Sequence, residues 1–212
     1  MSRRSADERR EELIEAAIRV MIRDGVGRAT TRAVVAEAGL PLGAFHYCFR
    51  SKEELLQSVI ERIMVRASAP AVAAAAADGA TAGGASADAV VRTALHAYWE
   101  RIRQTPDEHL LTYELTQYAL RQPGLAELAR KQYAHYTEVT RESLEAMARL
   151  AGIEWTVPLP VLARHGLGVL DGLTLTWLID RDDTLARAAL DEYASYLVSV
   201  TRRDGARGAR AE

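Results

Sequence analysis

The sequence predicts an all-α protein of about nine helices with no convincing strand. Alanine, leucine, glutamate and arginine, which favour helices, are abundant, whereas aromatic residues make up only 6% of the 212 residues. Apolar residues recur at helical spacing, and proline or glycine stands at most of the expected helix ends. With 49% apolar and 26% charged residues, the chain can bury a sizeable core and has the composition of an ordinary folded protein.

The first part of the chain is expected to contain four helices. Thr30 and Thr31 can cap a short helix that Gly39 ends, and Pro41 then forces a turn before the next short helix. Ser51 can cap the fourth helix. The four helices are expected to run from Ala6 to Arg23, from Thr31 to Ala38, from Leu42 to Phe49 and from Ser51 to about Ala77. The two short helices around a glycine-containing turn predict a helix-turn-helix motif.

The second part of the chain is expected to begin after a flexible connection. Residues 78–87 show no apolar period and contain three glycines, so a mobile segment is expected there. Proline and glycine then separate five further helices, expected at residues 87–104, 107–121, 125–151, 160–180 and 184–203. The predicted domains are therefore residues 1–50, with the helix-turn-helix motif, and residues 51–212.

Charge and cysteine content exclude several classes of protein. Residues 1–66 carry slightly more Arg and Lys than Asp and Glu, which permits a nucleic-acid surface, whereas the remainder is acidic. Cys48 is the only cysteine, so an internal disulfide framework is excluded and a reducing cytoplasm fits. The charged N-terminus and the lack of an apolar run of about 20 residues argue against a signal peptide, a membrane span and any membrane partner.

The helix-turn-helix segment carries a specific pattern. Its defining residues are Thr31-Arg32, Ala36, Ala38-Gly39, Gly43, Phe49, Ser51-Lys52 and Leu55. At this spacing, residues 8–60 closely resemble the DNA-binding domain of the tetracycline-repressor (TetR) family. Residues 113–121 and 171–175 also look like parts of that family's effector domains. The resemblance implies a homodimeric, ligand-controlled transcription factor, usually a repressor, whose partners are double-stranded operator DNA, a second copy of the chain and a small-molecule effector.

The resemblance also implies which residues contact DNA. They are Thr31, Arg32, Leu42, Gly43, Ala44, His46, Tyr47 and Lys52. A recognition helix that enters the major groove brings its first residues near base edges, while other residues bind phosphates and fix the register. The first three residues of this helix carry no hydrogen-bonding side chain, so direct readout must depend largely on Arg32 and Tyr47. Phe45 and Phe49 are expected to pack inward.

Aromatic residues in the second domain, together with a few polar ones, are typical of a small-molecule pocket. The candidate effector-binding residues are Trp99, Tyr113, Glu114, Gln117, Tyr118, Tyr136, Asp171, Thr174 and Trp177. Aromatic faces beside Glu114 or Asp171 would suit a cation, so cationic aromatic compounds are the first expected ligands, and acyl-type compounds the second. The alternative is that the aromatics are core residues, that Glu114 pairs with Arg121 or caps a neighbouring helix, and that Asp171 pairs with Arg164 or with a partner subunit.

The last two helices carry the predicted dimer interface. The candidate residues are Val161, His165, Gly168, Val169, Gly172, Tyr193 and Leu197. Gly168 and Gly172 lie four residues apart and would let another backbone approach closely. Two helices from each subunit would then form a four-helix interface whose two-fold symmetry matches a palindromic operator. The alternative is that these apolar stripes are buried within one subunit.

No catalytic set emerges from the sequence. It has no glycine-rich phosphate loop, no G-x-S-x-G motif and no H-E-x-x-H motif, and its five histidines are scattered. No catalytic residue, metal site or cofactor is therefore predicted. The alternative function, an all-helical small-molecule-binding protein or an enzyme without DNA binding, requires the helix-turn-helix pattern to be an accident.

Overall fold

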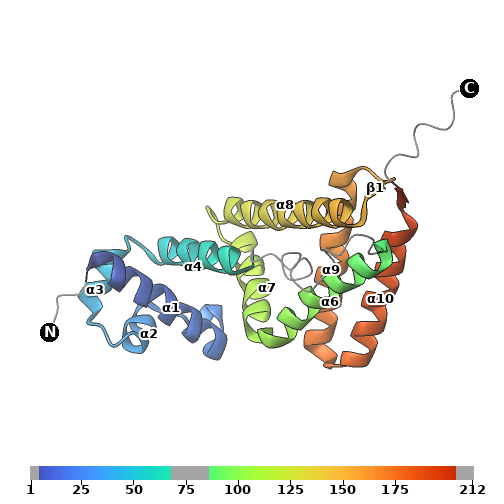
Figure 1. Ribbon diagram of the computed structural model, residues 1–212. Coiled ribbons are helices and arrows are strands. Elements are labelled where there is room, and N and C mark those ends of the chain that lie inside the picture. The colour runs from blue at the N-terminus through green and yellow to red at the C-terminus, as the bar shows by residue number, and fades with distance from the viewer. Residues whose placement is uncertain (1–4, 68–85, 204–212) are drawn as a thin grey trace, which may run out of the picture. The chain divides into compact units, whose positions relative to one another are not determined.

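The structure is a computed structural model that describes residues 5–67 and 86–203. Over these ranges the chain forms nine α-helices, a 3-10 turn and two short strands, which confirms the predicted all-α class (Figure 1). The elements are α1 (Ala6–Asp24), η1 (Val26–Arg28), α2 (Thr31–Glu37), α3 (Leu42–Cys48), α4 (Lys52–Ala67), α6 (Ala87–Gln104), α7 (Pro106–Arg121), α8 (Ala126–Ala151), β1 (Ile153–Trp155), α9 (Leu159–Asp180), α10 (Asp183–Ser199) and β2 (Thr201–Arg203). Within these ranges, no helix combines the length and the apolar character needed to cross a membrane.

Side-chain caps explain where several helices begin. In α1, Ser5 Oγ accepts the Glu8 N–H at 3.1 Å, and the Glu8 carboxylate accepts the Ser5 N–H at 2.6 Å. The Thr30 and Ser51 side chains each accept a backbone N–H three residues ahead at 3.2 Å, which confirms the predicted caps of α2 and α4. Asp182 caps α10 in the same way at 2.9 Å. These bonds satisfy N–H groups that the first helical turn leaves without partners.

The described residues form two compact units, each built from two segments of the sequence. The N-terminal unit holds residues 5–67 and 107–133, and the C-terminal unit holds residues 86–106 and 134–203. This division differs from the boundary expected between residues 50 and 51. The physical reason is that α4 and α7 bury apolar side chains, among them Val59 and Leu115, in the same core as α1.

The core of the N-terminal unit is built on α1, in which Leu13, Ala17 and Val20 are fully buried. Val34 from α2 and Phe45 from α3 join the same cluster. Each such Leu, Val or Phe contributes about 1.5–3 kcal/mol when it leaves water. Burial on α1 therefore fixes the positions of the two short helices of the helix-turn-helix motif.

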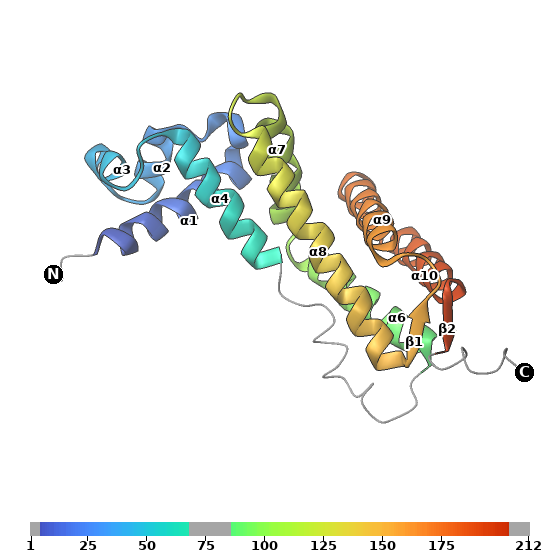
Figure 2. The ribbon, with the colours of Figure 1, turned by 90° about the horizontal axis from the view of Figure 1, so that it is seen from above.

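The C-terminal unit contains α6, α9, α10, the later part of α8 and the strands β1 and β2. Helices α9 and α10 run side by side in Figures 1 and 2. The core of this unit contains Trp99 and Ile102 from α6, Leu162 from α9, and Leu190 and Leu197 from α10. The apolar stripe of α10 thus faces its own unit.

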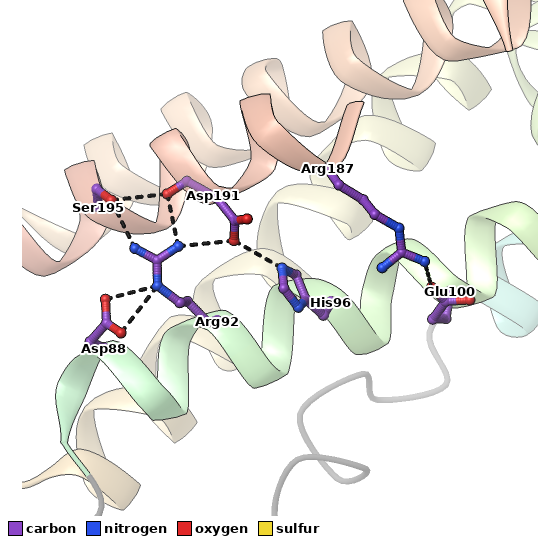
Figure 3. A network of polar contacts seen from close by, with 7 residues as sticks. All are labelled: Asp88, Arg92, His96, Glu100, Arg187, Asp191 and Ser195. Carbon is purple, nitrogen blue, oxygen red and sulfur yellow. Dashed lines mark hydrogen bonds and ion pairs between the residues drawn. The ribbon is translucent and has the colours of Figure 1, made fainter. Parts of the chain in front are cut away.

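A polar network also joins α6 to α10 (Figure 3). Arg92 donates hydrogen bonds of 2.9 Å to the carboxylate of Asp191 and to Ser195 Oγ. His96 Nε2 lies 3.0 Å from the same Asp191 carboxylate. Burial acts to raise the pKa of Asp191, but the hydrogen bonds from His96 and Arg92 outweigh it and hold the pKa below its usual value.

Part of the secondary structure differs from the prediction. Strands β1 and β2 pair antiparallel, with Ile153 opposite Arg203, whereas no strand was expected. Strands of three residues are too short to show an alternating pattern in the sequence. The last helix, expected to reach Arg203, ends at Ser199 because the chain then enters β2. The expected extension of α4 over residues 68–77, and residues 78–85 of the expected connection, lie outside the described residues.

Candidate nucleic-acid interface and ligand site

A glycine turn links α2 to α3. Gly39 has φ +63°, in the left-handed region that residues with side chains rarely adopt. Its N–H donates to the Ala36 carbonyl at 3.1 Å, and the Leu40 N–H donates to the Val35 carbonyl at 2.9 Å, which closes the end of α2. The chain enters α3 directly after Pro41. The local geometry is that of the helix-turn-helix motif.

Helix α3 has one buried face and one exposed face. Phe45 and Phe49 are 2% and 1% exposed, and their ring centroids lie 5.6 Å apart, which confirms the predicted inward packing. Tyr47 is 71% exposed and Leu42 43% exposed. Of the other residues predicted to contact DNA, Arg32, Gly43 and His46 are exposed, and Thr31, Ala44 and Lys52 are half-buried. The buried phenylalanines therefore leave the predicted contact face of α3 open to solvent.

Arg10 fixes the end of α3 against α4. Its guanidinium donates to the Cys48 carbonyl at 2.6 Å, to the Glu54 carboxylate at 3.1 Å and to Ser58 Oγ at 2.9 Å. It also lies 4.2 Å from the centroid of the Phe49 ring. Sequence reasoning missed this residue, because nothing in the pattern distinguishes Arg10 from the other charged side chains of α1. The contact orders the recognition helix without belonging to its exposed face.

Lys52 lies in the first turn of α4, and its Nζ is 5.9 Å from the centroid of the Tyr118 ring on α7. Tyr118 packs against the core of the N-terminal unit.

The sequence prediction places Tyr118 among the effector-binding residues, together with Tyr113, Glu114 and Gln117 of the same helix. All four lie in the N-terminal unit, whereas the other five candidates lie in the C-terminal unit.

Glu114 caps the neighbouring η1 turn, in agreement with the alternative that this carboxylate stabilises the fold. Its carboxylate accepts a hydrogen bond of 2.7 Å from the Val26 N–H at the start of η1. The preceding Gly25 has φ +87°, and a Cβ at this position would lie 3.3 Å from Glu114 Oε1. Glu114 therefore binds the backbone of its own unit, and Asp171 belongs to the C-terminal unit.

In the C-terminal unit, two of the predicted residues form a buried aromatic pair. Trp99 is 1% exposed and Trp177 is 6% exposed, and their rings meet edge to face with centroids 5.4 Å apart. The Trp177 indole N–H donates to the Asp183 carboxylate at 2.8 Å. No described residue accepts a hydrogen bond from the Trp99 indole N–H. Both rings are core residues of this unit, and one of them keeps an unused donor.

Polar groups surround Tyr98, which precedes Trp99 on α6. Burial raises the pKa of the Tyr98 phenol to about 12, and the nearby charge of Asp171 and the hydroxyl of Tyr136 act in the same direction. The Thr174 hydroxyl and Arg101 act in the opposite direction. The structure thus brings Asp171, Thr174 and Tyr136 to one phenol beside the tryptophan pair, which combines one carboxylate with several aromatic faces.

The predicted dimer residues divide between exposed and buried positions. On α9, Val161 is 58% exposed, and His165, Gly168 and Gly172 are exposed as well. Val169 is half-buried against the core. Leu175 and Ile179 extend the exposed face along α9, with Ile179 78% exposed, and sequence reasoning missed both.

Two of the predicted dimer residues are core residues instead. Tyr193 is 7% exposed and Leu197 1% exposed, because the apolar stripe of α10 packs within its own unit. The Tyr193 hydroxyl lies so close to Gly166 that a Cβ there would be 2.7 Å from it. The prediction for these two α10 residues is corrected, and the exposed apolar face belongs to α9.

A surface hollow of about 550 Å³ lies near β1. Glu154, Trp155, Thr156 and Arg202 line it together with apolar side chains. Its polar groups already have partners: Arg202 donates to Glu154 at 2.8 Å, and the Trp155 indole N–H donates to the Leu144 carbonyl at 3.0 Å. Because these polar groups are already hydrogen-bonded within the protein, the hollow is a weaker candidate for a ligand site than the region around Asp171 and Trp99.

Comparison with known proteins gives matches over most of the chain. Residues 13–59 match the family described as bacterial regulatory proteins, tetR family, and residues 87–200 match the C-terminal domain of BetI-type transcriptional repressors. The chain is 30% identical over 181 residues to the HTH-type nicotine-responsive transcriptional repressor HdnoR of Paenarthrobacter nicotinovorans, over 84% of this chain and 88% of that protein.

Solved structures are similar over the same length. The multidrug binding protein EbrR, solved in complex with imidazole, is 28% identical with a TM-score of 0.62, over 90% of this chain and 89% of that one. A transcriptional regulator from Rhodococcus sp. Rha1 is 22% identical with a TM-score of 0.67, over 91% of this chain and 97% of that one, which is a likeness of fold alone.

Proposed function

This chain belongs to the TetR family of bacterial regulatory proteins, and from that premise we propose that it is a dimeric repressor released from its operator by an aromatic amine. As a member of that family it is a ligand-responsive, DNA-binding transcriptional regulator of the helix-turn-helix type. The observation that carries the proposal is the exposed face of α3 within the matched range 13–59. We assign the chain no enzymatic reaction, and we place its action in the cytoplasm, where bacterial DNA lies.

The proposed DNA contacts follow from exposure and chemistry. The face of α3 that carries Leu42 and Tyr47 would enter the major groove, because the opposite face is buried against α1. Arg32, exposed in the first turn of α2, can form a bidentate bond with a guanine. Lys52 can bind a phosphate and so fix the register of the protein on the duplex.

The proposed dimer uses the exposed face of α9. Val161, Leu175 and Ile179 expose apolar surface there, and a second copy of the same face would cover it. Gly168 and Gly172 would let the two α9 backbones approach closely. The resulting two-fold symmetry requires an operator with two inverted half-sites.

The proposed effector, called an aromatic amine here, joins a basic aliphatic amine that is protonated at neutral pH to an aromatic ring. Asp171 supplies a negative charge near Tyr98, and Trp99 and Tyr98 supply aromatic rings, a combination that attracts organic cations. Trp177 already attracts one cation, because the Arg181 guanidinium lies 4.6 Å from the centroid of its ring. The relative HdnoR is nicotine-responsive, and nicotine joins a basic amine to an aromatic ring. Acyl-type ligands rank second, because a carboxylate near the aromatic pair disfavours a second negative charge.

The conformational change caused by effector binding in the C-terminal unit must reach the recognition helix α3 through an element that belongs to both units. An effector can act only by binding more tightly to a state in which the two copies of α3 no longer fit successive grooves. Helix α8 can transmit this change, because its first residues belong to the N-terminal unit and the others to the C-terminal unit. The bond between Glu114 of α7 and Val26 then links the change to the end of α1.

Selection of duplexes from a random library at low salt tests this proposal. The full-length protein should enrich an inverted repeat whose half-sites are separated by about one helical turn or a multiple of it. Two copies of the chain should bind each repeat, as measured by the mass of the complex. A library that shows no enrichment would overturn the proposal.

A further inference from the structure

Trp99 leaves a hydrogen-bond donor unused in the core of the C-terminal unit. The side chain is 1% exposed, and no described residue accepts its indole N–H. The other two tryptophans use theirs: Trp177 donates to Asp183 at 2.8 Å and Trp155 to the Leu144 carbonyl at 3.0 Å. An indole nitrogen can only donate, and a buried donor without an acceptor destabilises the folded state. The donor therefore requires an explanation.

The unused donor lies in the region proposed for the effector. Trp99 touches Trp177 edge to face, with ring centroids 5.4 Å apart. Its neighbour Tyr98 is close to Asp171 and Thr174, which lie on α9 six and three residues before Trp177. Thr174 is 1% exposed, and its hydroxyl lies beside the Tyr98 phenol. A carboxylate, a buried hydroxyl and the unmatched Trp99 N–H thus lie around the same aromatic pair.

We infer that the effector carries a hydrogen-bond acceptor for the Trp99 indole N–H, in addition to the cationic amine that Asp171 attracts. The inference rests on the proposed function and narrows the ligand class. It selects aromatic amines whose ring holds an acceptor, such as a pyridine nitrogen or a ring carbonyl. A plain phenyl ring would fill the same space but leave the donor unmatched.

The Trp99 N–H should make the protein bind a ligand with an acceptor more tightly than a ligand of the same shape without one. In the free protein the Trp99 N–H has no acceptor to lose among the described residues, so a ligand acceptor adds a hydrogen bond without breaking one of theirs. A ligand of the same shape without an acceptor keeps the donor unmatched in a buried site. A site that hydrogen-bonds a ligand group discriminates strongly against an analogue that lacks the group. An apolar pocket discriminates less strongly against an analogue that lacks one methylene.

A matched pair of amines tests the inference. Nicotine carries a pyridine nitrogen, and 1-methyl-2-phenylpyrrolidine is the same molecule with that nitrogen replaced by CH. Calorimetric titration of the wild-type protein should show that nicotine binds about 10-fold more tightly. In Trp99→Phe, which keeps an aromatic ring and removes the N–H, the preference should disappear through weaker nicotine binding. The analogue's affinity should change little, which shows that the site is intact.

Trp155→Phe is the control, because it removes an indole N–H that already has a protein acceptor, the Leu144 carbonyl. It should keep the preference for nicotine. A second measurement needs no stable Trp99 variant: nicotine should shift the indole N–H signal of Trp99 downfield in the NMR spectrum of the wild-type protein, and the analogue should not. Variants at Trp155 and Trp177 assign the three signals.

Three results would overturn the inference: equal affinity of the wild-type protein for the two amines, binding of neither, or a preference that survives in Trp99→Phe. These results are separable from failure of the proposed function. If both amines bind equally and release the operator, the proposed function stands and the acceptor requirement fails. If no operator is selected from random DNA, the proposed function fails whatever the two amines do.

Discussion

The carboxylate of Glu114 in α7 accepts a 2.7 Å hydrogen bond from the backbone N–H of Val26, which is 1% exposed. Glu114→Ala should lower the free energy of unfolding by about 1–2 kcal/mol, because it leaves this N–H without an acceptor. Glu114→Gln keeps an acceptor oxygen and should lose less than half as much. Urea denaturation of the two variants measures the difference, and an Ala variant as stable as wild type would show that the bond contributes nothing.

Lys52 should position the protein on DNA without specifying sequence. Lys52→Ala should weaken binding to operator and random duplexes together and lower the salt slope by about one unit, because one phosphate contact is lost. Titrations at several salt concentrations measure the slope. Lys131→Ala removes the same charge from an exposed position on α8 and is the matched control. A loss confined to one base pair would contradict the phosphate role.

Arg32 should read a base. Arg32→Ala should relax the preference at one position in each half-site, where a bidentate arginine contact contributes about 1–3 kcal/mol of discrimination. Arg32→Lys keeps the charge but not the planar fork, so it should relax the same position while preserving most of the overall affinity. Affinities for operators mutated base by base measure both effects. An unchanged preference profile in both variants would assign Arg32 to the phosphates.

Asp191 should make the C-terminal unit less stable in acid. Its pKa lies below the ordinary value of about 4, so its contribution to stability is complete above that pH and is lost as pH falls through the lower folded value. Asp191→Asn should therefore be less stable than wild type at pH 7, and the gap should shrink towards pH 2.5. Thermal unfolding midpoints across this range measure the gap, with Glu192→Gln as the matched control. A gap independent of pH would contradict the account.

Much of the helical framework could be predicted because its signals are local. The caps at Thr30 and Ser51 and the left-handed turn at Gly39 depend on residues within one turn of the helix end. The exposed face of α3 follows from the same kind of signal, since Phe45 and Phe49 lie four residues apart and are buried together. The local spacing of residues is therefore sufficient to predict these helix ends and the face of α3 that is the candidate for DNA contact.

The effector site was less predictable because spacing does not show which core a helix joins. Tyr118 and Glu114 lie on a helix whose apolar face packs with α1 and α4, so they belong to the N-terminal unit. Leu197 shows the same effect, because its apolar stripe suited either a dimer interface or the core. The contact between Trp99 and Trp177 joins residues 78 positions apart, and no pattern along the chain marks it.

Release of the operator by an aromatic amine is the most direct test of the central claim. The selected duplex, carrying a fluorescent label, is bound by the full-length protein, and its anisotropy is followed as nicotine and other aromatic amines are added. The account predicts that anisotropy falls to the value of free DNA, that Asp171→Asn requires a higher amine concentration, and that Glu192→Gln, which removes an exposed carboxylate from α10, responds like wild type. A protein that binds no duplex, or a complex that none of the amines dissociates, would contradict the claim.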